Sequence, residues 1–235
     1  MRPSIAAGRR LGVAWRIGPR GLSVILLCFA AGTTDALSYL TLGHVFTSAM
    51  TGCAALLCLK LASGNYAVVL RAGIALSSYL VGCAVATVLQ PRDKAQLSTP
   101  RVLRRLMGLE FLLLLFYAVS SDGSAGAARV CWLIFLSATA MGVQSIVARD
   151  LHESGVSTVV LNPTMTRFGM TLTDVALGRV RSLPGESRLQ ALVMLAYAGG
   201  ATVTAFGVLD HSGITSLLPL AAVGGVFLLS IVPGL

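Results

Sequence analysis

The sequence has few charged residues, and acidic ones are especially scarce. Only 11% of its 235 residues are charged, with 9 Asp and Glu against 18 Lys and Arg. A soluble domain carries about 25% charged residues, so this chain has too little charge to cover a water-exposed surface. In addition, 55% of the residues are hydrophobic, and several apolar runs approach or exceed the roughly 20 residues that span a bilayer as a helix. These features predict an all-α polytopic membrane protein.

The sequence also lacks the usual motifs of enzymes and metal sites. It contains no Gly-rich phosphate loop, nucleophile elbow or paired-carboxylate motif. Its five cysteines form no Cys-x-x-Cys pair, and its three histidines form no ligand cluster. We therefore expect no catalytic residue, no metal site and no cofactor. The net charge of +9 does not indicate nucleic-acid binding, because the basic residues gather at the ends of apolar runs, where they set membrane orientation.

The apolar runs divide the chain into eight segments with short loops between them. A basic tail, residues 1–20, precedes a single integral membrane domain, residues 21–235. A first span that remains uncleaved fits better than a signal peptide, because no convincing cleavage site follows it. The segments cover residues 22–42, 45–62, 67–89, 106–119, 130–148, 156–177, 189–209 and 214–232.

Two of these segments differ from simple spans. The second follows Gly43, and the sixth contains Pro163, Arg167 and Asp174. Proline removes a backbone donor, and a charge at the bilayer centre costs about 2.5–3.5 kcal/mol. We expect both segments to be broken or re-entrant, which leaves about six full spans; the alternative is eight spans.

The distribution of basic residues favours six spans. With a cytoplasmic N-terminus, six spans leave only Lys60, Arg71 and Arg129 outside. Eight spans instead place a larger basic set outside, namely Arg92, Lys94, Arg101, Arg104, Arg105 and Arg149. Basic loop residues resist export, so the six-span topology is the better prediction.

The two halves of the chain contain matching sequence motifs. The matching pairs, in the same order in each half, are Gly32-x-x-Asp35 with Gly142-x-x-Ser145, Val45-x-Thr47 with Val156-x-Thr158, and Tyr79-x-x-Gly82 with Tyr197-x-x-Gly200. The pattern predicts two repeats, residues 22–119 and 130–232. If each repeat crosses three times, the second is inverted relative to the first, which is a recurrent transporter design.

The motifs of both halves resemble the YoaK-type family of bacterial membrane proteins, a domain of unknown function. In the first half the residues that fit are Gly32, Asp35, Ala36, Tyr39, Phe46, Met50, Thr51 and Gly52, with Cys53 in place of the usual asparagine. In the second half they are Gly142, Gln144, Val156, Ser157, Thr164 and Arg167, with Ser145 in place of asparagine and Asn162-Pro163 in place of Thr-Gly. The resemblance implies a divergent member with about six spans, and supplies no reaction or substrate. We expect it in the bacterial inner membrane, with its N-terminus in the cytoplasm.

Asp35 is the leading candidate for a site residue, because an intramembrane carboxylate is a functional hypothesis by default. It could bind a cation, relay a proton or accept from backbone donors; the alternative is a structural anchor that bonds neighbouring hydroxyls or caps the next segment. Arg167 could pair with Asp35, bind an anionic substrate, or extend to a lipid headgroup.

The other candidate substrate contacts are polar residues of the two halves. They are Thr47, Gln144, Ser145, Thr158 and Asn162. Interhelical hydrogen bonding is the structural alternative for Gln144 and Ser145, and Asn162-Pro163 indicates a helix break. Glu110 is predicted to be an interfacial carboxylate paired with a loop arginine.

The leading functional hypothesis is a transporter or channel, in which a small polar or charged solute crosses where the repeats meet. The alternative is a non-transporting membrane scaffold, or a lipid-binding or envelope protein. Both place the chain in a lipid bilayer without nucleic acid, and an intramembrane enzyme comes third.

Overall fold

In the computed structural model, all regular secondary structure in the described parts of the chain is helical. These parts are residues 17–91, 100–121, 126–151, 161–180, 182–210 and 213–231. The helices are α1 (Pro19–Thr41), α2 (Met50–Ala62), α3 (Tyr66–Leu89), α4 (Pro100–Ser120), α5 (Ala127–Leu151), α6 (Leu161–Ala176), α7 (Gly185–Leu209), the 3₁₀ helix η2 (Gly213–Ser216) and α8 (Leu217–Leu229). Each of the eight segments predicted from the sequence therefore contains a helix.

Four helices are long and apolar enough to cross a bilayer: α1, α3, α5 and α7. α2 and the η2–α8 unit are shorter apolar helices. A polytopic membrane protein follows from this composition and length. Residues 1–16 of the predicted tail, residues 1–20, are outside the described residues. The end of that tail is helical, because α1 begins at Pro19.

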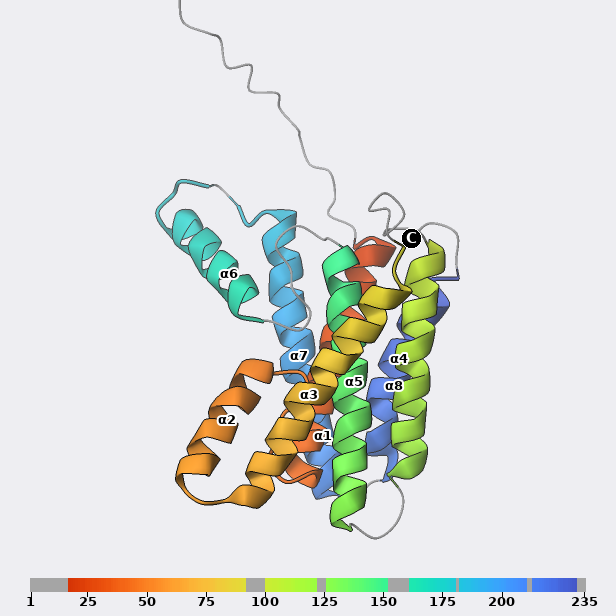
Figure 1. Ribbon diagram of the computed structural model, residues 1–235. Coiled ribbons are helices and arrows are strands. Elements are labelled where there is room, and N and C mark those ends of the chain that lie inside the picture. The colour runs from red at the N-terminus through yellow and green to blue at the C-terminus, as the bar shows by residue number, and fades with distance from the viewer. Residues whose placement is uncertain are drawn as a thin grey trace, which may run out of the picture.

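Two helix pairs form the centre of the bundle. α1 packs against α7 and α3 packs against α5, and these are the most extensive helix interfaces. α4 packs against α5 and α8, and α8 also packs against α1. Figure 1 shows α1, α3, α4, α5, α7 and α8 side by side, with α2 and α6 projecting from the same side of the bundle.

Glycines allow the two central pairs to approach at backbone distance. A Cβ on Gly32 of α1 would lie 2.1 Å from the Tyr197 carbonyl oxygen of α7, and one on Gly142 of α5 would lie 2.2 Å from the Tyr79 carbonyl oxygen of α3. A Cβ on Gly82 would likewise meet the Thr139 carbonyl at 2.1 Å. Small residues at helix interfaces are the usual means of close packing in membranes.

Helices at matching positions in the two halves run in opposite directions (Figure 1). α1 runs downward and α5 upward, α3 runs upward and α7 downward, and α4 runs downward and α8 upward. α2 begins at the middle of the bundle and runs to its lower end, whereas α6 begins near the middle and runs to its upper end. Each of these short helices covers only about half of the bundle's height.

Basic residues gather at one end of the bundle. The upper end in Figure 1 holds the starts of α1, α4 and α7 and the end of α5, which carry Arg20, Arg101, Arg104, Arg105, Arg188 and Arg149. The lower end holds the end of α2 and the starts of α3 and α5, which carry Lys60, Arg71 and Arg129.

Candidate functional site

The segment between α1 and α2 turns back into the bundle. Gly43 and His44 both have positive φ, at 87° and 65°, which reverses the chain directly after α1. The Arg71 guanidinium lies against Gly43, so close that a Cβ there would collide with its Nη1. The positive φ favours glycine at this position, whereas the contact with the flexible end of Arg71 can be relieved by a shift of that side chain. The chain then places Val45, Thr47 and Ser48 in the interior, with at most 2% exposed.

Asp35 supplies the hydrogen-bond acceptors that this buried, irregular backbone needs. Its Oδ1 accepts from the backbone N–H groups of Thr47 at 3.0 Å, Ser48 at 2.7 Å and Ala49 at 3.4 Å. Its Oδ2 accepts from the Ser48 hydroxyl at 2.7 Å and from the Tyr197 hydroxyl at 2.8 Å. The carboxylate thus joins three elements: α1, the entry to α2, and α7.

Asp35 binds the segment that leads into α2 rather than the helix itself. Its backbone donors are Thr47, Ser48 and Ala49, which precede the first helical residue, Met50. A negative charge at a helix N-terminus is also stabilised by the helix dipole. Asp35 therefore holds the irregular segment at the N-terminal end of α2. Of the roles raised from the sequence, acceptance from backbone donors is the one that the structure contains.

An open groove of about 360 Å³ lies beside Asp35. It is lined by residues of α1, the entry segment and α7, namely Asp35, Ala36, Tyr39, Leu40, Phe46, Tyr197, Ala201, Thr202 and Ala205. The Tyr39 ring stacks on Phe46 with centroids 5.2 Å apart, and meets His44 edge-on at 5.0 Å. The groove therefore combines one carboxylate with aromatic rings and small walls.

Thr47 belongs to this site, whereas Gln144 and Ser145 lie in the second half of the bundle. The Thr47 hydroxyl is 3.3 Å from that of Ser38. Gln144 is fully buried and donates from Nε2 to the Leu27 carbonyl of α1 at 2.9 Å. Ser145 donates to the Gly142 carbonyl at 2.7 Å and lies 3.4 Å from the Cys83 sulfur of α3. For Gln144 and Ser145, the contacts found are the interhelical and intrahelical bonds of the structural alternative.

The remaining predicted site residues are on α6 or outside the described residues. Asn162 and Arg167 are exposed on α6. Asn162 and Pro163, the predicted helix break, lie at the start of the described part of α6, and residues 152–160 before it are outside the described residues. Thr158 lies outside the described residues.

The predicted pairing of Asp35 with Arg167 does not occur. Both oxygens of the Asp35 carboxylate are occupied by donors from the α2 entry and α7, while Arg167 is an exposed residue of a helix that packs mainly against α7. The only ion pair among the described residues is a different one, between Arg179 and Asp174 at 3.1 Å. The buried carboxylate is satisfied by backbone amides rather than by a cation, which sequence reasoning underweighted.

The prediction for Glu110 is also wrong. Its side chain is fully buried, and neither carboxyl oxygen has a hydrogen-bond partner among the described residues. The apolar run starts at residue 106, which places Glu110 near a helix end. The helix instead continues back to Pro100 through Arg101, Arg104 and Arg105. Glu110 is therefore near the middle of α4 rather than at the interface.

Sequence reasoning missed Tyr197 and Ser48 as parts of the site. Tyr197 had been noted only as a repeat match to Tyr79, and that match was the available signal. The Tyr79 side chain reaches Ser145, as Tyr197 reaches Asp35. Matched tyrosines thus contact the matched residues of the other half.

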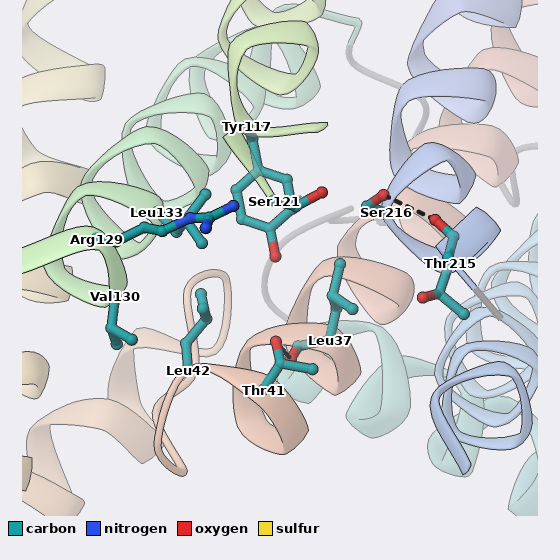
Figure 2. A pocket seen from close by; sticks show the side chains of 11 residues that line it. Leu37, Thr41, Leu42, Tyr117, Ser121, Arg129, Val130, Leu133, Thr215 and Ser216 are labelled. Atoms are coloured by element: carbon teal, nitrogen blue, oxygen red, sulfur yellow. Dashed lines mark hydrogen bonds between the residues drawn. The ribbon is translucent and has the colours of Figure 1, made fainter. Parts of the chain in front are cut away.

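A second pocket of about 230 Å³ lies at the lower end of the bundle (Figure 2). Its lining includes Thr41, Tyr117, Arg129 and Thr215, from the end of α1, from α4, α5 and η2. The Arg129 guanidinium is bonded to the Ser120 carbonyl, with Nε at 2.7 Å. This hydrogen bond ties the start of α5 to the end of α4 and leaves the positive charge of Arg129 in the pocket wall.

The comparisons with known proteins identify relatives without an assigned activity. A family model described as "Protein of unknown function (DUF1275)" matches residues 23–230. The chain is 29% identical over 215 residues to the UPF0700 transmembrane protein YoaK of Bacillus subtilis (strain 168), covering 89% of this chain and 93% of that protein. No solved structure matches.

Proposed function

Because the chain belongs to the DUF1275 family of proteins of unknown function, its function has to be inferred from its own geometry. We propose that it is a transporter or channel for a small polar or charged solute, built from two inverted repeats. The observation that carries this proposal is a half-length helix whose buried start is held by Asp35 beside an open groove. The proposal assigns the chain no catalytic reaction.

Matched contacts support the inverted repeat. Gly32 of α1 meets the carbonyl of Tyr197 on α7, and Gly142 of α5 meets the carbonyl of Tyr79 on α3. The reciprocal pair is also present, since Gly82 meets the Thr139 carbonyl as Gly200 meets the Phe29 carbonyl. Exchange of the two halves therefore converts the α1–α7 interface into the α5–α3 interface. The opposite directions of the matched helices in Figure 1 support inversion.

The helix arrangement supports six spans with two re-entrant helices. α2 begins near mid-height and runs to the lower end, where α1 also ends, and α6 runs to the upper end, where α5 also ends (Figure 1). Such backbone breaks are tolerated at membrane depth only where they are buried in protein or line a water-filled cavity. The basic upper end of the bundle, by the positive-inside rule, faces the cytoplasm with the N-terminus. In a bacterial cell, this places the groove nearer the outer face of the inner membrane.

The groove is open to its surroundings rather than enclosed. It reaches Asp35, but no α6 residue lines it. In inverted-repeat transporters the two repeats exchange conformations, so that the site opens to alternate faces. We infer that the structure corresponds to an outward-open state and that the second half forms the matching opening around Ser145 and Tyr79 in the other state.

The test is a flux measurement on the purified protein in liposomes. A panel of small cations, anions and neutral solutes is presented, and uptake is followed by stopped-flow light scattering and by solid-supported membrane currents. Asp35→Asn keeps the size of the side chain and one oxygen that can accept from the backbone N–H groups, but it removes the negative charge. We expect it to abolish the flux of a charged solute, whereas the exposed control Asp174→Asn leaves that flux unchanged. A flux that is identical in Asp35→Asn overturns the role of Asp35.

A non-transporting scaffold is the second candidate, and one observation favours it. The backbone contacts at Gly32, Gly82, Gly142 and Gly200 close each of the two central helix pairs, so neither pair is itself a pore. This candidate predicts no protein-dependent flux of any solute in the panel.

A further inference from the structure

We propose that the groove beside Asp35 binds a small organic ammonium cation. This inference rests on the proposed transport function and names its substrate class. The groove is defined by nine residues of α1, α7 and the entry to α2. Among them Asp35 is the acidic residue and none is basic.

The charge of the groove favours a cation. Three of the five donors to Asp35 are backbone N–H groups, which can only donate, so the side chain fits as an ionised acceptor. No ion pair to Asp35 exists in the described part of the chain. Hydrogen bonds from neutral donors stabilise the ion without cancelling its charge. The N-terminus of α2 contributes only about half an elementary charge, so a net negative potential remains at the wall of the groove.

The aromatic rings favour an organic cation over a metal ion. Tyr39 and Phe46 stack on each other, with Tyr197 on the opposite helix. Both stacked rings line the groove, and a cation over the face of such a ring gains about 0.5–2 kcal/mol. A metal ion would need several oxygen ligands, whereas both Asp35 oxygens are already engaged by protein donors. An alkylated ammonium needs no inner-sphere ligand.

The walls leave room for a small ligand. Ala36, Ala201 and Ala205 are small lining residues, and the volume of about 360 Å³ is in the range of small-molecule sites. An anion would meet the Asp35 charge without any basic residue to offset it.

The ammonium group can come from a free solute or from a phospholipid headgroup. The groove is open along its length rather than enclosed, so a headgroup can enter it. Both sources present the same chemistry to the carboxylate and the rings. The experiment therefore separates them by varying the lipid.

The experiment measures equilibrium binding to the full chain by calorimetry. The protein is held in nanodiscs of phosphatidylglycerol alone, and the probes are choline, its neutral isostere 3,3-dimethyl-1-butanol and the anion 3,3-dimethylbutyrate. We expect choline to bind at least about tenfold more tightly than either other probe. We expect Phe46→Leu and Tyr39→Leu each to weaken choline binding by about 2- to 30-fold, while the exposed aromatic control Phe116→Leu on α4 does not.

Equal binding of choline and the neutral probe overturns the proposal, as does unchanged choline binding in both ring variants. Repetition in nanodiscs with phosphatidylethanolamine identifies the source. Weakened choline binding there shows that a headgroup competes for the groove, and unchanged binding shows that a free solute is the ligand.

Failure of this inference is distinguishable from failure of the transport proposal. Choline binding without flux of any solute supports the cation site and contradicts transport. Flux of an anionic or neutral solute, with no choline binding, supports transport and contradicts the cation site.

Discussion

Replacement of Asp35 by alanine should unfold the entry to α2. The substitution leaves the amides of Thr47 and Ser48 without an acceptor, at positions that are at most 2% exposed. Each buried donor that is left unsatisfied costs about 1–3 kcal/mol. The third amide, of Ala49 at 3.4 Å, adds little because the bond is long. The Ser48 and Tyr197 hydroxyls also lose their acceptor, although a hydroxyl can rotate to another partner. The sum is a loss of about 4 kcal/mol.

Asparagine at the same position should cost much less. Its side-chain oxygen accepts from the same amides, so the loss is the difference between a charge-assisted and a neutral hydrogen bond, about 1–2 kcal/mol. Asp174→Asn is the matched control, because Asp174 pairs with Arg179 on the surface with 43% of its side chain exposed, where an ion pair contributes at most about 1 kcal/mol.

The assay is thermal unfolding in detergent combined with hydrogen exchange of residues 47–53. The expected order of melting temperatures is wild type, then Asp35→Asn, then Asp35→Ala, with faster exchange at 47–53 in the alanine variant. If Asp35→Ala has the melting temperature of the wild type and residues 47–53 exchange at the same rate, Asp35 does not stabilise the entry to α2, and the reasoning is refuted.

Three further predictions concern single side chains. Gly32→Ala should destabilise the protein by about 1–3 kcal/mol, because the new Cβ would collide with the Tyr197 carbonyl. The control Gly199→Ala, which has open space around it, should not lower the melting temperature. Equal melting temperatures of the two variants would contradict the close approach of α1 and α7. Tyr197→Phe should lower stability by about 1.5–3 kcal/mol through the lost bond to the Asp35 carboxylate, as measured by chemical unfolding, and a neutral effect would show that this bond contributes nothing. Glu110→Gln should not destabilise the protein and Glu110→Leu should raise its melting temperature, since neither carboxyl oxygen has a described partner; a clear loss in both variants would reveal a contact that the described residues lack.

The number and order of the helices followed from the sequence because long apolar runs can only be spans or broken spans in a bilayer. The break after α1 was also predictable, since Gly43 directly precedes the second apolar run and takes positive φ in the structure. The start of α4 was not, because Arg101, Arg104 and Arg105 interrupt the apolar pattern without interrupting the helix.

The Asp35 contacts were only partly predictable. A buried carboxylate indicates a need for donors, but local spacing suggested neighbours on α1 or a charged partner. The donors instead come from residues 12 to 14 positions later and from α7. Such contacts depend on how the chain returns into the bundle, which helical periodicity does not specify. The repeat match between Tyr79 and Tyr197 was the one sequence signal that linked α7 to this site.

The inverted arrangement is tested most directly by the accessibility of two single cysteines in intact bacterial cells. Ser63→Cys lies in the α2–α3 turn and Ser182→Cys in the α6–α7 link, and both positions are exposed; exposed Cys58 on α2 is replaced by serine in this background. Six spans with re-entrant α2 and α6 predict that a membrane-impermeant thiol reagent labels residue 63 in intact cells and residue 182 only after the membrane is opened. Labelling of residue 63 only after opening would contradict the account, because it would mean that α2 crosses the membrane.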